Sequence, residues 1–374
     1  MPYALIAHEL QRLNIDIAAL SEVHLPEEGS LQEQGAGYTL YWSGKPRSAK
    51  RLSGVGFMVK TSIASKLEHL PTGHSDRIMS MRLPLQNQQH ATLFSVYTPT
   101  LLAEPVDKER FYSDLRTLLQ STLVDDKIII LGDFNARVGQ DAKAWKGVLG
   151  KHGVGKCNDN GYLLLELCAE QQLVITNTVF QQRNSRKTTW MHPRSKHWYL
   201  IDYVIVRQKD MKDVLHTRVM PSAEGHTDHR LVRCKLKLQF KPKTKKGGNT
   251  KKYKISSLQS ANVETVFQEG LQSKLVSLDD LNEPSPVTLW QHLKTVITST
   301  SAEVLGFSTK KNKDLFDENN EEIQELLCRK RAAHQAHLAQ PSYSVKKSAF
   351  HQTCSNLQRK LRDIQNEWWT SLAQ

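Results

Sequence analysis

The sequence contains no long apolar run. Its longest uninterrupted apolar stretches have about four to six residues, whereas a helix that crosses a bilayer needs about twenty. The basic, apolar and small-residue pattern of a signal peptide is also absent, and so are lipidation motifs. We therefore expect an intracellular protein without a membrane partner.

Paired cysteines are absent as well. The chain has five cysteines among 374 residues, an odd number, and none of them forms a C-x-x-C pair. A disulfide framework or a zinc finger needs an even, regularly spaced set. The cysteine pattern therefore argues against both classes of protein.

Acidic residues are too few to balance the basic ones. The chain has 51 Lys and Arg against 38 Asp and Glu, a formal net charge of +13, and the stretch from Arg233 to Lys254 contains no acidic residue. A basic excess favours a polyanionic partner; together with the motif resemblance described below, it leads us to expect DNA as the partner and a nuclear location. The basic segment 241–254 is either a solvated linker alone or a linker that also contacts nucleic acid or an import receptor.

Strand-like and helix-like patterns divide the chain. The length allows one large α/β domain and a smaller appendage. We predict a domain over residues 1–240, a basic linker over 241–254 and a helical region over 255–374. Strands are expected at 15–22, 54–59, 78–83, 93–97, 127–131, 173–176, 199–206 and 231–240, and helices at 3–14, 110–123, 162–171, 256–271, 289–305, 319–338 and 344–372.

The most informative motif is Gly132-Asp133-Phe134-Asn135, which follows the apolar run 127–131. This run is typical of a buried central strand, and such a strand delivers its last side chains to the edge of a sheet, where ligands bind. Two positions separate Asp133 from Asn135, so we expect both side chains on one side, converging on a metal-bound water or a phosphate. Because Gly, Asp and Asn are also common in turns, a simple strand-ending turn remains an alternative.

Other predicted strands also end in polar groups that a core would not choose. The first strand ends at Glu22, and another ends at Tyr97 before a proline. Asp202 lies within the apolar strand predicted at 199–206, and Asp228-His229 precede the alternating stretch 231–240. Several strand edges carrying such groups indicate one shared polar site.

These motifs, in this order, resemble those of the endonuclease/exonuclease/phosphatase superfamily. The segments Tyr97-Thr-Pro-Thr, Gly132 to Gly139 and Thr189-Trp190 narrow the likeness to the endonuclease of LINE-type (non-LTR) retrotransposons, and within it to the craniofacial development protein 2-like group. Residues 314–323 resemble the connector that precedes the reverse transcriptase in such elements. The resemblance implies a retrotransposon origin and a fusion to, or loss of, a reverse transcriptase.

The resemblance also implies the fold class. We expect an α/β protein with two mixed β-sheets packed face to face and flanking helices, a four-layer sandwich, followed by a mostly helical C-terminal extension. The family's first strand, with its Asn in a W-N-V-R-type segment, has no counterpart before the predicted helix at 3–14. We therefore expect an N-terminally truncated domain without that strand.

By the resemblance, Glu22 and Asp228 belong to a metal site. The expected cofactor is Mg²⁺, with Mn²⁺ as a substitute, because these ions prefer oxygen ligands. Asp133 would orient or deprotonate the attacking water, and Asn135 would donate to a phosphate oxygen.

His229 would bind the scissile phosphate, and Asp202 would fix its tautomer and ring direction. The hydroxyl of Tyr97 would lie near the same phosphate. The residues predicted to contact the nucleic acid are Arg47, Lys50, Arg51 and Trp190.

The leading functional prediction is a Mg²⁺-dependent, DNA-nicking endonuclease of retrotransposon origin. The alternative is a catalytically impaired retroelement remnant that binds nucleic acid or chromatin, which the missing first strand favours and the intact polar motifs oppose. A third option is a superfamily phosphatase acting on inositol lipids or sphingomyelin, which the basic excess and the LINE-like motifs disfavour.

Overall fold

The computed structural model of the protein describes residues 2–33, 35–50, 53–223, 227–240, 253–275, 286–307, 315–340 and 343–373. The chain divides into two units, Met1–Lys243 and Thr244–Gln374. Most of the predicted linker 241–254 lies outside the described residues. The domain boundaries at 240 and 254 therefore stay a prediction.

The first unit is built around a six-stranded mixed sheet. Its strand order is β11-β14-β8-β7-β6-β5, with β7 and β8 parallel and the other neighbours antiparallel. The apolar run at 127–131 forms the inner strand β8, as predicted. The strands are β5 (Thr72–Gly73), β6 (Ile78–Pro84), β7 (His90–Tyr97), β8 (Lys127–Asp133), β11 (Leu173–Ile175) and β14 (Asp202–Arg207).

A second, four-stranded sheet has the order β1-β4-β3-β2 and is antiparallel throughout. The sequence prediction included β1 and β4 but not β2 and β3. Glycines interrupt the region around β2, and β3 is buried on both faces, so neither segment shows the clean alternation that marks a half-buried strand. The strands are β1 (Ile17–Ser21), β2 (Glu28–Glu33), β3 (Tyr38–Ser43) and β4 (Val55–Lys60).

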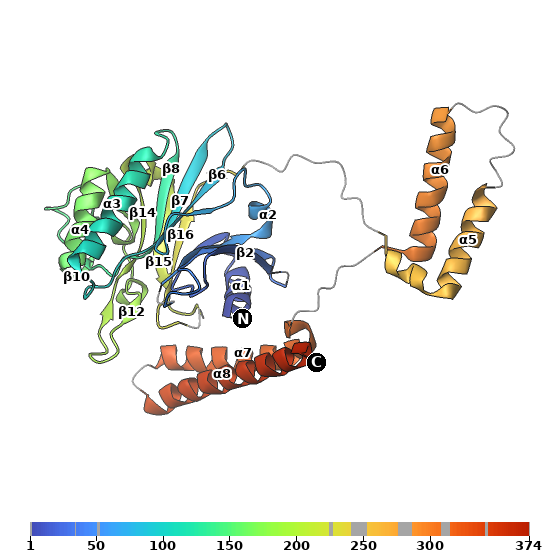
Figure 1. Cartoon of the computed structure of the whole chain (residues 1–374). Coiled ribbons are helices and arrows are strands. Elements are labelled where there is room, and N and C mark those ends of the chain that lie inside the picture. Colours follow the sequence, from blue (N-terminus) through green and yellow to red (C-terminus); the bar gives the residue numbers. More distant parts are fainter. Residues whose placement is uncertain are drawn as a thin grey trace. The chain divides into compact units, whose positions relative to one another are not determined.

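The two sheets pack face to face between helices. Strand alternation sends Ile129 of β8 into the core between the sheets, while Ile128 and Ile130 face α3 (Pro105–Ser121) and α4 (Asp159–Glu170). Helix α1 (Pro2–Arg12) covers the outer face of the four-stranded sheet. The four layers, visible in Figure 1, confirm the predicted fold class.

Short ribbons and turns complete the first unit. The two-stranded sheets are β9–β10, β12–β13 and β15–β16. Their strands are β9 (Val138–Gly139), β10 (Val154–Cys157), β12 (Trp190–Met191), β13 (Trp198–Tyr199), β15 (Val214–Met220) and β16 (Leu231–Leu236). The short helices are α2 (Thr61–Ala64) and the 3₁₀ turns η1 (Thr176–Thr178), η2 (Asn184–Arg186) and η3 (Gln208–Asp213).

The second unit is helical in its described residues, as predicted. Helix α7 packs along α8, and α5 packs against α6. Within the described residues, no helix is long and apolar enough to cross a membrane. The elements are η4 (Ile255–Gln259), α5 (Ala261–Leu275), α6 (Pro286–Thr300), the π-helical turn η6 (Ser301–Leu305), α7 (Leu315–Ala339) and α8 (Ser344–Ala373).

One glycine allows β7 and β8 to pair closely. Gly132 has a φ of +155°, and a Cβ at this position would lie 1.9 Å from the carbonyl oxygen of Val96. No side chain fits there unless the backbone of β7 moves. We expect Gly132→Ala to lower the free energy of unfolding by several kcal/mol, at the upper end of single substitutions, where about 4 kcal/mol is exceptional.

The matched control is Gly37→Ala, because Gly37 also has a positive φ (+73°) but its Cβ would meet no atom within 4 Å. This variant should lose only about 1 kcal/mol, the strain of a left-handed non-glycine residue. Urea unfolding of both variants gives the comparison, and equal losses would contradict the proposed clash.

Candidate active site

The sheet register places three predicted site residues in one row. Tyr97 lies opposite Asp133 in the β7–β8 pair, and Asp133 lies opposite Asp202 in the β8–β14 pair. Asp133 and Asp202 share the strand alternation of Ile129 and Val204, which face the core between the sheets. The three side chains therefore point from adjacent strands toward the second sheet, with Tyr97 and Asp133 only 6% and 5% exposed.

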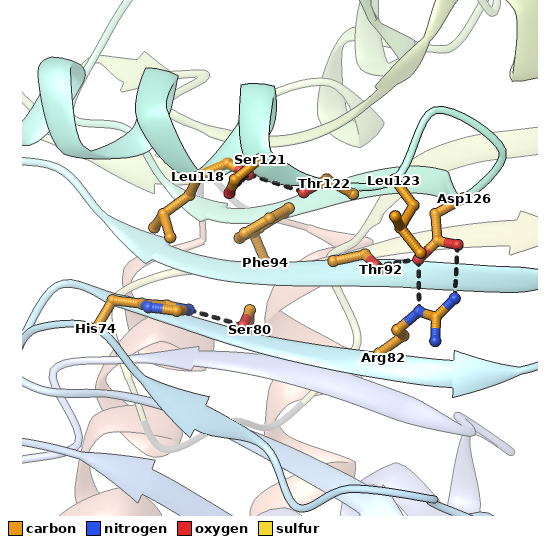
Figure 2. Close-up of a pocket in the computed structure, with 10 residues that line it drawn as sticks. All are labelled: His74, Ser80, Arg82, Thr92, Phe94, Leu118, Ser121, Thr122, Leu123 and Asp126. Carbon is orange, nitrogen blue, oxygen red and sulfur yellow. Dashed lines mark hydrogen bonds and ion pairs between the residues drawn. The ribbon is translucent and has the colours of Figure 1, made fainter.

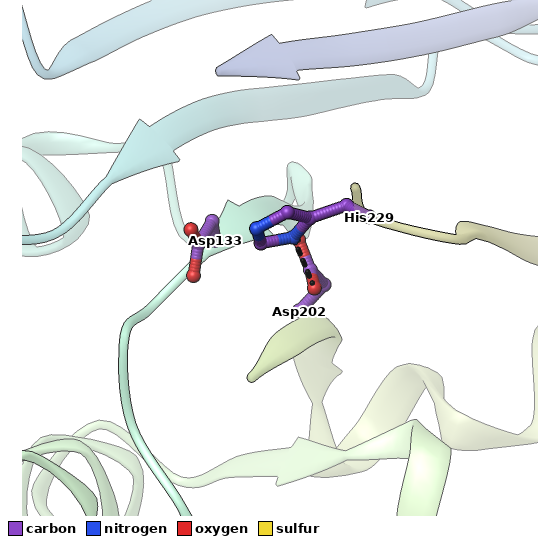
Figure 3. Close-up of side chains that lie close together, drawn as sticks. All are labelled: Asp133, Asp202 and His229. Carbon is purple, nitrogen blue, oxygen red and sulfur yellow. Dashed lines mark hydrogen bonds and ion pairs between the residues drawn. The ribbon is translucent and has the colours of Figure 1, made fainter. Parts of the chain in front are cut away.

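His229 joins this row from the loop between β15 and β16. Its Nδ1 lies 3.0 Å and 3.2 Å from the two carboxylate oxygens of Asp202, and its ring points toward Asp133 (Figure 3). Burial alone would lower the pKa of His229, but the hydrogen bond to Asp202 and the charges of Asp202, Asp133 and Asp228 raise it to about 9. In the absence of a bound cation, this shift favours the protonated imidazole at neutral pH.

The carboxyl group of Asp133 is difficult to ionise. Burial raises its pKa first, and the negative charges of Asp202 and Glu22 add to that rise. The charge of His229 and the backbone N–H of Asn135, which donates to Oδ1 at 2.8 Å, lower it only in part. A group with a raised pKa, close to neutral pH, is suited to accept a proton from water.

Glu22 and Tyr97 form a pair beside this cluster. The hydroxyl of Tyr97 donates to Oε1 of Glu22 at 2.6 Å. Burial and this hydrogen bond raise the pKa of Tyr97, so that the phenol stays protonated. Arg77 holds Tyr97 from the other side, with its guanidinium 5.1 Å from the ring centroid and Nη1 donating to the Tyr97 carbonyl at 3.1 Å.

The side-chain direction of Asn135 differs from the sequence prediction. Strand β8 ends at Asp133, and Asn135 has a φ of +45°, so strand alternation no longer sets its direction. Its Nδ2 donates to the carbonyl of Thr98 at 2.9 Å. The amide thus bonds to the loop after β7, which leaves its second N–H for a ligand.

Trp190 contacts two other predicted residues of the site. Its indole Nε1 donates to Oδ2 of Asp228 at 2.8 Å, and its ring is tilted against the His229 ring at 6.3 Å. Trp190 therefore positions two predicted site residues, whereas the sequence analysis predicted a contact to nucleic acid. A hydrogen bond between residues 38 positions apart leaves no local signal in the sequence.

The other predicted nucleic-acid contacts lie on the surface or outside the described residues. Arg47 is exposed and lies 3.6 Å from the carboxylate of Glu27. Lys50 is exposed, and Arg51 is not among the described residues. Their predicted role in binding stays a prediction.

Two residues that hold Asp202 were not predicted. The hydroxyl oxygen of Thr189 accepts the backbone N–H groups of Ile201 and Asp202 at 3.1 Å and 3.4 Å. Asn177 donates to the carbonyl of Asp202 at 3.1 Å and accepts the N–H of Val204 at 2.9 Å. Thr189 lies in a motif segment that the sequence analysis named, but only the folded chain brings Thr189 and Asn177 to the start of β14.

The donor set suits a hard cation with oxygen ligands. Asp133, Asp202 and His229 offer ligand atoms within 4.8 Å of one another. A hard cation such as Mg²⁺ prefers oxygen to imidazole nitrogen, so carboxylates are the ligands that suit it. After burial, the charges of Asp202 and Glu22 raise the pKa of Asp133, and a divalent cation held nearby would relieve that repulsion.

A hollow of about 290 Å³ lies at the other end of β7 and β8 (Figure 2). Asp126, which precedes β8, receives two hydrogen bonds from Arg82, at 2.7 Å and 3.0 Å, and one from Thr92. These bonds keep the pKa of Asp126 low although burial opposes it. Because its main polar groups satisfy one another, we assign this hollow a structural role.

Comparison with known proteins gives the following similarities. The profile of the endonuclease/exonuclease/phosphatase family matches residues 2–223. Craniofacial development protein 2 of Bos taurus is 32% identical over 288 residues, which cover 76% of this chain and 46% of that protein. The chain thus spans about half the length of this relative.

Solved structures with low similarity include an AP endonuclease from Leishmania major, with a TM-score of 0.44, 16% identity and coverage of 64% of this chain and 82% of the other. The endonuclease domain of TRAS1, a telomere-specific non-LTR retrotransposon, has a TM-score of 0.42, 14% identity and coverage of 64% and 93%.

The buried carboxyl of Asp133 leads to an expectation about stability. Its folded-state pKa lies above that of the unfolded chain, so folding becomes less favourable as pH rises from about 4 through the raised pKa. Asp133→Asn removes this penalty. In EDTA near pH 8 we expect the variant to melt a few degrees above the wild type, at roughly 2–4 °C per kcal/mol.

The control Asp114→Asn changes an exposed carboxylate on α3 and should leave Tm nearly unchanged. Thermal melts at pH 5 and pH 8 measure the difference, which should grow with pH. Added Mg²⁺ should stabilise the wild type more than Asp133→Asn. A lower Tm for Asp133→Asn at both pH values would contradict the assigned electrostatic penalty.

Proposed function

Because this chain belongs to the endonuclease/exonuclease/phosphatase family, we propose that it is a metal-dependent phosphodiesterase that nicks DNA and that it derives from a LINE-type retrotransposon. The observation that carries the proposal is the arrangement of a cationic imidazole beside a buried acid. His229 bonds to Asp202 and faces Asp133 across the row of strand ends. Phosphodiester hydrolysis needs both a cation for the phosphoryl oxygens and a base for water.

The proposed reaction uses the residues as follows. Asp133, when ionised, takes a proton from the water whose oxygen attacks phosphorus, and the P–O bond to the leaving sugar oxygen breaks. The protonated His229 binds a non-bridging phosphate oxygen and stabilises the negative charge that develops there. The free N–H of Asn135 donates to the same phosphate, and Asp202 holds the imidazole in its direction.

We propose Glu22 and Asp228 as the residues that hold the divalent cation. Such an ion, when bound, stabilises charge on phosphoryl and leaving oxygens. Tyr97 orients Glu22 through its 2.6 Å hydrogen bond, and Trp190 orients Asp228 through its 2.8 Å bond. Each proposed ligand thus has a fixed partner on its other side.

DNA is the proposed substrate because of charge and of sequence likeness. The net charge of +13 favours a polyanion over a small neutral substrate. The motif resemblance to LINE-type endonucleases supports DNA over a lipid headgroup, and with it a nuclear site of action.

The first test is nicking of supercoiled plasmid by the full chain. We expect nicking with Mg²⁺ or Mn²⁺ and none in EDTA, because the repelling carboxylates need a cation. His229→Ala should lower the rate roughly 100- to 1000-fold, the typical loss of one charge-stabilising group, while duplex binding changes little. The matched control is His69→Ala, because His69 is exposed and distant from His229 in the sequence. This variant should retain the wild-type rate.

The pair of His229 and Asp202 gives a further check on the same assay. If Asp202 acts only by holding the imidazole, the double variant His229→Ala/Asp202→Asn should be little slower than His229→Ala alone. If the losses in nicking rate of the two single variants multiply in the double variant, Asp202 has a role separate from that of His229. A wild-type chain that binds DNA but never nicks it would instead support the catalytically impaired remnant.

The pH profile of nicking should be bell-shaped. On the acid side, activity falls as Asp133 becomes protonated, at a pH below its metal-free pKa because the bound cation relieves part of the repulsion. On the alkaline side, activity falls as His229 loses its proton near pH 9. Because Asp202 makes the largest contribution to raising the pKa of His229, ahead of Asp133 and Asp228, Asp202→Asn should move the alkaline limb toward the ordinary histidine value of about 6.5. If the alkaline limb does not move, it does not arise from the titration of His229.

A further inference from the structure

The ribbon of β15 and β16 has two chemically different faces. The pairs Thr217–Cys234 and Val219–Val232 face inward, where Thr217 and Val219 are each 1% exposed. The intervening pairs, His216–Lys235 and Arg218–Arg233, face outward. This outer face of β15–β16 therefore carries four basic or imidazole side chains on two adjacent pairs.

Arg218 and Arg233 lie directly opposite each other across the two strands. Cβ atoms in such pairs are about 4.5–5.5 Å apart, and like charges there are destabilising. Among the described residues, neither arginine forms an ion pair or hydrogen bond that would offset this repulsion. Within the part of the chain that the structure describes, these two opposed cations therefore have no paired counter-charge.

A third arginine extends the outer face of β15–β16. The turn η2, which ends in Arg186, packs beside β15. His216 bonds to Gln182 at 2.8 Å, and after burial the charges of Arg218, Arg186 and Arg233 lower its pKa. Three guanidinium groups thus surround one imidazole, which stays neutral and leaves the positive charge on the arginines.

We propose that the outer face of β15–β16, with Arg218, Arg233 and Arg186, binds the phosphate backbone of duplex DNA beside the nicked position. The occupant follows from charge complementarity, since several phosphates in a row supply counter-charges that the described residues do not give Arg218 and Arg233. The inference rests on the proposed function, because it takes DNA as the substrate of the same unit.

The position of this face fits such a contact. Asp228 and His229 lie in the loop that joins β15 to β16, and Arg233 follows His229 by four residues. At about 3.4 Å per extended residue, the backbones of His229 and Arg233 are at most roughly 14 Å apart. Duplex DNA rises about 34 Å in each turn of about ten base pairs, so this face reaches phosphates within about four base pairs of the nick.

The test measures how duplex affinity depends on salt. The full chain is titrated onto a fluorescently labelled 20-base-pair duplex in EDTA, between about 50 and 200 mM salt, and the slope of log affinity against log salt is taken. Arg218→Gln/Arg233→Gln should flatten the slope by about 1.8, since each lost phosphate contact removes about 0.9. Arg218→Lys/Arg233→Lys keeps the charges and should retain most of the slope.

The matched control is Arg110→Gln/Lys212→Gln, which removes two exposed charges of the same unit from α3 and η3. Its slope should stay near that of the wild type.

The melting temperature separates lost binding from lost folding. Because Arg218→Gln/Arg233→Gln removes a like-charge pair, this variant should melt at or above the wild-type Tm.

The outcomes separate this inference from the proposed function. If the wild type nicks plasmid but Arg218→Gln/Arg233→Gln has the slope of the control, the inference is wrong and the proposed function stands. If Arg218→Gln/Arg233→Gln loses affinity for a single-stranded RNA of equal length but not for the duplex, the face binds RNA. That result would also overturn the inference. A wild type that binds no duplex at all would overturn the proposed function itself.

Discussion

The pairing of β8 with β7 on one side and β14 on the other is the constraint on which the candidate site depends. It requires a glycine at position 132, because only a residue without a Cβ allows the close approach to Val96. The resulting register brings Tyr97, Asp133 and Asp202 into one row. A slip of one residue would turn Asp133 and its neighbours to the opposite face, so the chemistry of the site follows directly from backbone pairing.

The row concentrates negative charge where water is scarce. Asp133 is buried beside Asp202, and only the cation of His229 and one backbone N–H oppose the repulsion. Thr189 and Asn177 hold the backbone of Asp202 in place, so the acids cannot move apart easily. Strain of this kind is typical of functional sites, where a preorganised charge arrangement is retained at the expense of stability.

Catalytic and binding groups share the β15–β16 ribbon. Its loop holds Asp228 and His229, its inner face packs into the core, and its outer face carries Arg218 and Arg233. Inner and outer residues alternate along one ribbon. A DNA backbone bound to the outer face would therefore have a fixed position relative to His229 in the loop. The ribbon thus joins two basic residues to the loop that holds the proposed reacting groups.

The sequence by itself determined the family, the inner strand β8 and the polar residues at the strand ends, because residue type and alternation are local properties. It also indicated the helical second unit. Only the tertiary structure decided that Asn135 turns toward Thr98, that Trp190 bonds to Asp228, and that Arg218 meets another arginine. Periodicity tells which face of a strand is buried, but register and distant partners arise when segments far apart in the chain pair with one another.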